Sequence, residues 1–175
     1  MIRAAIVDLE PTIQRIPDVR LIHYVRDPRA VAVSQALVTA LTFSVVDRRP
    51  TTEAQLLCQV MLDDLKAKRR LERRYPGAVL TVRYEDFVRD PKSVTRRVFD
   101  FVGQPVPAAF RRWTTTVMNV RYAKLAEDAF GTHRINSTAT AEGWLSRASY
   151  RDLLDMNRNC RQVLNLLGYE LLLNV

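Results

Sequence analysis

Short apolar runs alternate with longer stretches of helical periodicity along the chain. Residues 19–25 and 78–82 are apolar and rich in β-formers, and they predict two strands. Helices are expected at about residues 29–45, 52–74, 91–102, 107–117 and 149–167, and residues 119–143 read as irregular. Strands that alternate with helices predict an α/β fold with a parallel sheet covered on both faces.

Several helix ends carry local signals. Asp27-Pro28 and Asp90-Pro91 are typical helix starts, with proline at the first helical position. Thr52 with Gln55 forms a capping-box pattern that predicts the start of the second helix. One apolar stripe is expected on that helix, made of Leu57, Val60, Met61 and Leu65. Glycines at 103 and 168 are expected to end the third and last helices.

A ligand site is expected among the residues just after each strand, because parallel sheets bind ligands at the carboxyl ends of their strands. Arg26 follows the first strand, and Asp27 is placed to cap the next helix. Ser34 lies on that helix with its hydroxyl expected to lean back toward the strand end. Arg26, Ser34 and a helix N-terminus together suit a phosphate monoester. Spacing alone equally allows Arg26 to pair with a carboxylate and Ser34 to pack against its own helix.

A second group of residues, 83–87, follows the other strand. Tyr84 stands where an aromatic ring could line a purine, and a core position is the open alternative. Phe87 is expected in the core. In the same alternative, Glu85 and Asp86 pair with Arg83.

The amino-acid composition indicates the kind of partner that the protein binds. The net charge is +8, and it comes from 23 arginines against 4 lysines. Arginine presents a planar fork that matches phosphate and sulfate oxygens, so the excess favours an anionic partner, although a GC-rich genome also favours arginine codons. No apolar run is long enough to span a bilayer, and the first residues lack signal-peptide character. Cys58 and Cys160 fit no zinc pattern and are expected as buried free thiols, or as one disulfide in an oxidising compartment.

The ordered motifs resemble the Golgi carbohydrate sulfotransferases. Residues 24–34 (YVRDPRAVAVS) and 83–87 (RYEDF) carry the resemblance, and later stretches at 103–107, 132–137, 143–145 and 160–169 follow in the family's order. The family transfers a sulfuryl group from 3′-phosphoadenosine 5′-phosphosulfate (PAPS) to a sugar hydroxyl, without a metal. The resemblance implies a P-loop-kinase-like parallel sheet with flanking helices, and a glycan or proteoglycan acceptor.

The resemblance also assigns residues. Arg26 and Ser34 match the family's ligands of the PAPS 3′-phosphate, and Tyr84 lies where related enzymes contact adenine. Arg134 falls in a late segment that closes over the nucleotide in related enzymes. Arg3 matches a basic residue near the acceptor site.

One family feature is missing from the sequence. The family's first strand ends in a Gly/Ser-rich loop around the 5′-phosphosulfate, and none of the five glycines lies in such a loop. Residues 1–175 are therefore expected to be one domain, the C-terminal portion of a sulfotransferase domain, with an incomplete sheet and no activity of its own. No catalytic base is identified, and Asp8 and Glu10 are expected as ordinary surface charges.

The resemblance implies a Golgi-lumen enzyme, with any membrane contact made through an N-terminal anchor that this chain lacks. The sequon at Asn136 agrees with that location. The alternative is a basic fragment or degenerate paralogue that binds nucleotide or sulfated glycan without turnover. No nucleic-acid-binding motif is found, and the absence of a Gly-x-x-x-x-Gly-Lys loop disfavours a nucleotide kinase.

Overall fold

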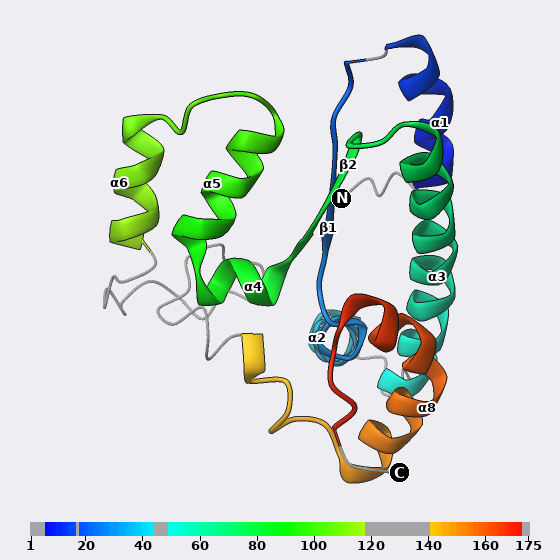
Figure 1. The fold of residues 1–175 in the computed structure, drawn as a ribbon. Helices are drawn as coiled ribbons and strands as arrows, with labels where there is room; N and C mark the ends of the chain where they lie inside the picture. Colours follow the sequence, from blue (N-terminus) through cyan, green and yellow to red (C-terminus); the bar gives the residue numbers. More distant parts are fainter. Residues whose placement is uncertain (1–5, 17, 44–48, 118–140, 173–175) are drawn as a thin grey trace.

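The computed structural model describes residues 6–16, 18–43, 49–117 and 141–172. Two strands, β1 (Leu21–Val25) and β2 (Val79–Arg83), pair in parallel within this part of the chain. Leu21 lies opposite Val79, and Val25 lies opposite Arg83. Both strands therefore end at the same edge of the sheet, where the sequence predicted a ligand (Figure 1).

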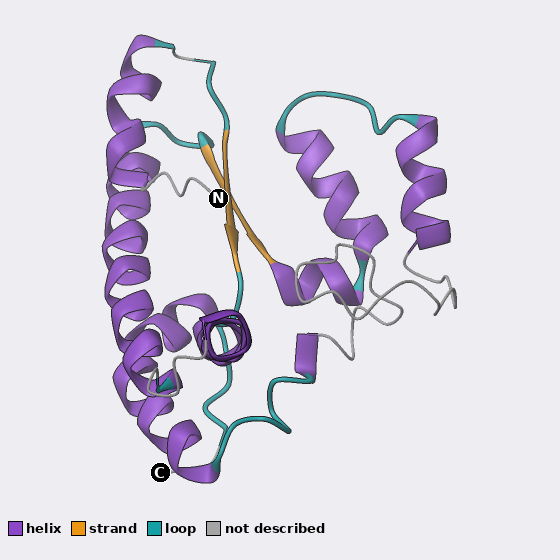
Figure 2. Cartoon of the chain, turned by 180° about the vertical axis from the view of Figure 1, so that it is seen from behind, coloured by secondary structure: helices purple, strands orange, loops and turns teal. Residues whose placement is uncertain are grey.

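Helices lie on either side of the two strands. α1 (Ile6–Arg15) and α3 (Pro50–Arg74) run along one side, and α5 (Pro91–Phe101) and α6 (Ala108–Val117) lie on the other (Figures 1 and 2). Arg97 of α5 donates a hydrogen bond to the Thr81 carbonyl oxygen at 3.3 Å, which ties α5 to β2. The α/β fold with a short parallel sheet and flanking helices is thus confirmed.

Three further helices gather at the carboxyl ends of the strands. α2 (Pro28–Phe43) starts two residues beyond β1, and α4 (Tyr84–Arg89) continues directly from β2. α8 (Tyr150–Leu167) packs against both α2 and α3. Figure 1 shows α2 end-on beneath the strands, with α8 beside it.

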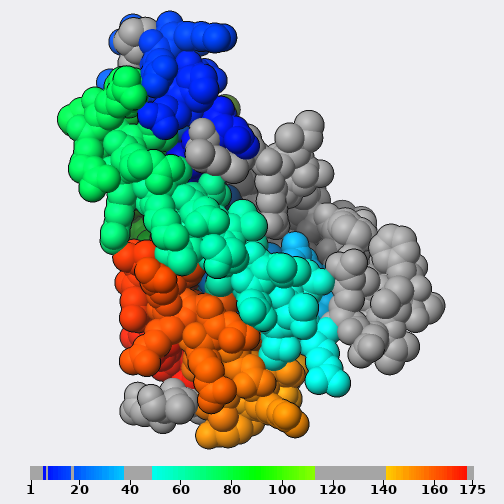
Figure 3. Space-filling model, turned by 90° about the vertical axis from the view of Figure 1, so that its right-hand side faces the viewer, coloured from blue at the N-terminus to red at the C-terminus, as the bar shows by residue number. Residues whose placement is uncertain are grey.

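The apolar core has two parts. One part joins α2, α3 and α8 through residues such as Ala30, Leu65 and Leu164, and the other joins α1 to α3 and β2 through Ile13 and Leu71. Figure 3 shows α8 lying alongside α3 on the outer face of the molecule. α3 therefore acts as the common support of both parts. None of the described helices combines the length and apolarity needed to cross a membrane.

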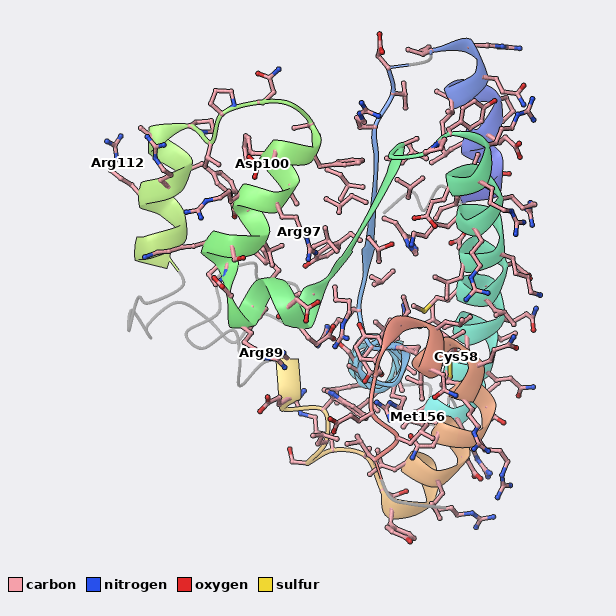
Figure 4. The ribbon with its side chains drawn as sticks, viewed as in Figure 1. Cys58, Arg89, Arg97, Asp100, Arg112 and Met156 are labelled. Atoms are coloured by element: carbon pink, nitrogen blue, oxygen red, sulfur yellow. A yellow bond between two sulfur atoms is a disulfide. The ribbon has the colours of Figure 1, made fainter. Side chains whose placement is uncertain are left out.

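A disulfide joins α3 to α8. Cys58 and Cys160 are bonded to each other, with Cα atoms 5.4 Å apart, and both are buried. Figure 4 labels Cys58 at the point where the two helices lie side by side. Of the two alternatives that the sequence left open, the disulfide is therefore the one found, because the two apolar helical positions meet in the core.

The predicted start of α3 is also wrong. The helix begins at Pro50 with Arg49 as its N-cap residue, and the Arg49 side chain makes no capping hydrogen bond. Proline fits the first helical position because its missing N–H would have no partner there. Thr52 therefore lies inside the first turn. Within the predicted apolar stripe, Leu65 is buried but Val60 is 54% exposed. Cys58, which was not in the stripe, is buried in the core.

The other end signals are confirmed. Asp90 accepts a hydrogen bond from the Ser93 N–H and caps α5. Ser149 accepts one from the Asp152 N–H and caps α8. Gly168 ends α8 in the left-handed conformation, with φ of 69°.

Burial shifts the pKa of two side chains on β1, His23 and Tyr24, and His23 is the one that titrates near neutral pH. Burial lowers the pKa of His23; Asp64 and Glu72 oppose this shift, and Lys68 reinforces it. The unfolded state therefore binds more protons than the folded state near and below the ordinary histidine pKa of 6.5. We expect the free energy of unfolding to fall as the pH is lowered through this range.

Urea unfolding followed by circular dichroism at pH 7.5 and at pH 5.5 measures the effect. The His23→Gln variant should lose less stability between the two pH values than the wild-type chain. The same pH-dependent loss in both proteins would show that His23 does not contribute to it.

Candidate nucleotide-phosphate site

Arg26 is the first residue beyond β1, at the carboxyl edge of the sheet. Because Val25 pairs with Arg83, Arg26 lies beside Tyr84, and its guanidinium carbon is 4.8 Å from the centre of the Tyr84 ring. The side chain is half-buried, and its Nε is buried without a hydrogen-bond partner among the described residues. A buried guanidinium nitrogen without an acceptor is costly, so this position fits an anionic ligand.

The alternative, a carboxylate partner for Arg26, receives no support from its neighbours. Asp27 instead pairs with Arg29, whose Nε and Nη2 donate to the two Asp27 carboxylate oxygens at 3.0 and 2.8 Å. The Glu85 carboxylate accepts from the Asp27 N–H at 3.0 Å and from the Tyr169 hydroxyl at 2.7 Å. Both nearby carboxylates are therefore engaged elsewhere.

Asp27 also closes the N-terminus of α2. Its Oδ1 atom accepts from the Arg29 N–H at 2.9 Å, as a capping residue does. The predicted cap is thus confirmed, with a consequence for ligand binding. Since a carboxylate already occupies the start of α2, its backbone N–H groups are a weaker anion site than the sequence suggested. An anion at this edge of the sheet would therefore depend more on side-chain donors than on the helix N-terminus.

Ser34 lies one helical turn after the fully buried Ala30 and is half-buried itself. Its hydroxyl forms no hydrogen bond with any described residue, so it is available to a ligand. The predicted placement on the Ala30 side of α2 follows from helical spacing.

Tyr84 opens α4, a six-residue helix that sequence periodicity did not reveal. The ring is half-buried beneath the Arg26 guanidinium, and Phe87 is half-buried rather than fully in the core. Arg83 lies 3.7 Å from Asp86, as expected, but Glu85 is not its partner. The alternative in which Glu85 also pairs with Arg83 is not found, because the Glu85 carboxylate accepts from the Asp27 N–H and from the Tyr169 hydroxyl.

A buried polar network behind the site was missed by sequence reasoning. Arg29 is 2% exposed and donates to the Asn157 side-chain oxygen at 2.6 Å and to the Glu170 carbonyl oxygen at 3.0 Å. Burial, followed by the hydrogen bond to Glu85, raises the pKa of the Tyr169 hydroxyl, which therefore stays protonated as a donor. The sequence shows the charged residues of 26–29 as a motif. No local pattern, however, indicates their hydrogen-bond partners, which lie more than 80 positions away.

The remaining predicted residues lie elsewhere. Arg134 and Arg3 fall outside the described residues. Asp8 is exposed, and Glu10 forms an ion pair with Arg74 at 3.5 Å, so both behave as the surface charges expected of them. Within the described ranges, no three His, Cys, Asp or Glu side chains come together as metal ligands.

Comparison with known proteins identifies similar sequences. The chain is 30% identical over 165 residues to human carbohydrate sulfotransferase 1. The aligned region covers 88% of this chain and 39% of that relative. It is 27% identical over 166 residues to mouse carbohydrate sulfotransferase 4, covering 87% of the chain and 42% of that relative. The chain thus spans about two fifths of the length of these curated relatives.

The fold has a solved counterpart. The sulfotransferase domain from the curacin biosynthetic pathway superposes with a TM-score of 0.58 at 19% identity, over 94% of this chain and 60% of that one. A family model described as "Sulfotransferase family" matches residues 5–108, which include β1, α2, α3, β2 and α4. By this match, the chain belongs to the sulfotransferase family.

Proposed function

We propose that Arg26 and Ser34 bind the 3′-phosphate of PAPS, and that Tyr84 borders its adenine ring. The proposal rests chiefly on the Arg26 guanidinium, which lies at the carboxyl edge of the sheet and whose buried Nε has no hydrogen-bond partner among the described residues. A phosphate oxygen would supply the missing acceptor and a counter-charge. The Ser34 hydroxyl, which has no partner in the described part of the chain, would donate a second hydrogen bond, and charge-assisted bonds of this kind are the stronger class.

For the whole protein, we propose transfer of a sulfuryl group to a carbohydrate hydroxyl. The acceptor oxygen would form a bond to sulfur as the bond from sulfur to the phosphate oxygen breaks, and adenosine 3′,5′-bisphosphate would leave. The acceptor proton would pass to a base that the described residues do not identify. Arg26 and Ser34 would act at the far end of the donor, by fixing the nucleotide in line for the reaction. Residues 1–175 would form one domain that supplies this half of the donor site.

Glycan or proteoglycan acceptors and a Golgi-lumen location are part of the same proposal. The named relatives are carbohydrate sulfotransferases. The buried disulfide between α3 and α8 fits an oxidising compartment, where such bonds persist.

The Arg26→Ala variant tests the phosphate assignment. We expect its affinity for adenosine 3′,5′-bisphosphate to fall by about 10- to 100-fold, because a hydrogen bond to a charged group contributes about 1.5–3 kcal/mol. Isothermal titration calorimetry on the chain measures the change. Arg26→Lys should recover only part of the affinity, since lysine keeps the positive charge but lacks the planar, forked donors of the guanidinium.

Arg89→Ala is the matched control. Arg89 lies at the far end of α4, is 75% exposed and is 3.9 Å from Asp86 (Figure 4). Its removal should leave the affinity unchanged. If Arg26→Ala binds the bisphosphate as tightly as the wild-type chain does, the 3′-phosphate assignment is wrong.

A further inference from the structure

A hydrogen-bond network links the segment that follows α8 to the loop between β1 and α2, through side chains of α2, α4 and α8. Arg29 donates to the Glu170 carbonyl oxygen at 3.0 Å. Asn157 donates to the Leu172 carbonyl oxygen, and its own side-chain oxygen accepts from Arg29. Tyr169 donates to Glu85, whose other oxygen accepts from the Asp27 N–H. The loop that presents Arg26 is therefore held from outside by α4 and by the end of α8.

Glu85 is the centre of this arrangement. Its Oε1 atom accepts from the backbone of Asp27 at 3.0 Å, and its Oε2 atom accepts from the Tyr169 hydroxyl at 2.7 Å. A carboxylate with two such donors has little freedom to rotate. The peptide group between Arg26 and Asp27 is thereby fixed in orientation, and that group sets the direction in which the Arg26 side chain leaves the chain.

Tyr169 is itself held firmly. The left-handed turn at Gly168 directs the chain back across the end of α8, and the Tyr169 N–H donates to the Leu164 carbonyl oxygen at 2.8 Å. The Arg83 guanidinium stacks 4.3 Å from the centre of the Tyr169 ring and donates to the carbonyl oxygens of Leu167 and Gly168. Burial raises the pKa of the hydroxyl, so it remains a donor at physiological pH. The hydroxyl thus points at Glu85 from a fixed position.

We propose that Tyr169 and Glu85 are positioning residues for the phosphate site: they hold the backbone at Asp27 so that Arg26 meets the nucleotide 3′-phosphate. This inference rests on the proposed role of Arg26. It assigns a function to the end of α8, which lies far along the chain from β1 and touches no nucleotide in the proposal.

The Tyr169→Phe variant tests the inference, because it keeps the ring beneath Arg83 and removes only the hydroxyl. We expect its affinity for adenosine 3′,5′-bisphosphate to fall by about three- to tenfold, in the range of one lost hydrogen bond. The affinity for adenosine 5′-monophosphate, which lacks the 3′-phosphate, should stay the same. Titration calorimetry with both nucleotides on the chain gives the two values. Tyr150→Phe, at the exposed start of α8, is the matched control and should change neither.

Glu85→Gln provides a second, independent variant. It keeps the shape of the side chain but offers one oxygen where the native residue offers two, so it should also weaken binding of the bisphosphate selectively. Since both residues act through one contact, the double variant should lose no more affinity than the larger single loss. Thermal unfolding of each variant shows whether it is folded.

The outcomes separate the two proposals. An equal loss for both nucleotides, or no loss for either, would overturn the positioning role while Arg26→Ala still weakens bisphosphate binding. Additive losses in the double variant would overturn it as well. If Arg26→Ala has no effect on the bisphosphate, the assignment of the phosphate site itself fails.

Discussion

Replacing Asp27 with alanine is expected to lower the free energy of unfolding by about 3–5 kcal/mol, the range for breaking a buried ion pair by removing one partner. The Arg29 side chain is 2% exposed, and two of its nitrogens donate to the Asp27 carboxylate at 3.0 and 2.8 Å. Without that carboxylate, a guanidinium charge stays in the core with only neutral acceptors, from Asn157 and Glu170. The same change removes the cap of α2. Urea unfolding with linear extrapolation measures the loss.

Two controls separate the charge from the cap. A double variant, Asp27→Ala with Arg29→Met, should recover part of the lost stability. It removes the unpaired buried charge but does not restore the cap of α2. Lys66→Ala disrupts an exposed pair with Asp63 on α3 and should cost less than about 1 kcal/mol. A loss of that small size for Asp27→Ala would mean that the buried pair does not anchor the loop after β1.

Removing the disulfide is expected to have an effect of similar size. Cys58 and Cys160 are 102 residues apart, and a cross-link over such a loop restricts the unfolded chain strongly. The chain-entropy account gives about 4.7 kcal/mol for a loop of this length, and measured losses in native proteins are about 2–5 kcal/mol. We expect the Cys58→Ala, Cys160→Ala variant to lose stability in that range. Urea unfolding under non-reducing conditions measures it.

Reductant supplies the control for this prediction. Dithiothreitol should lower the stability of the wild-type chain and leave that of the double alanine variant unchanged. Wild-type protein that unfolds at the same urea concentration with and without reductant would contradict the prediction.

Much of the fold was predictable because its signals are local. The two strands are short apolar runs, and the ends of α5 and α8 carry side-chain caps or glycine, each of which acts over a few residues. The start of α3 was misplaced because two local signals competed there, and Pro50 at the first helical position prevailed over the Thr52 capping pattern. α4 was missed because six residues are too few to display a helical period.

The site was predictable only in part. The position of Arg26 at the carboxyl edge of the sheet could be predicted because it directly follows a strand. Its role as a ligand, with those of Ser34 and Tyr84, stays a prediction from the family resemblance. The alternative considered for Glu85 paired it with Arg83, its near neighbour in sequence, whereas its partner Tyr169 is 84 positions away. No periodicity or motif encodes such a contact, since only the packing of α8 against α2 and α3 brings it about.

The link between Arg29 and Glu170 also has a consequence for biosynthesis. The two residues are 141 positions apart, so a ribosome adding about 5–20 residues per second needs roughly 7–28 seconds to make the second after the first. During that interval the guanidinium of Arg29 can pair with Asp27, but the Glu170 carbonyl oxygen that completes its set of hydrogen-bond acceptors has not yet been made. The loop that carries Arg26 is therefore translated early and reaches its final shape only after the end of α8 has been made.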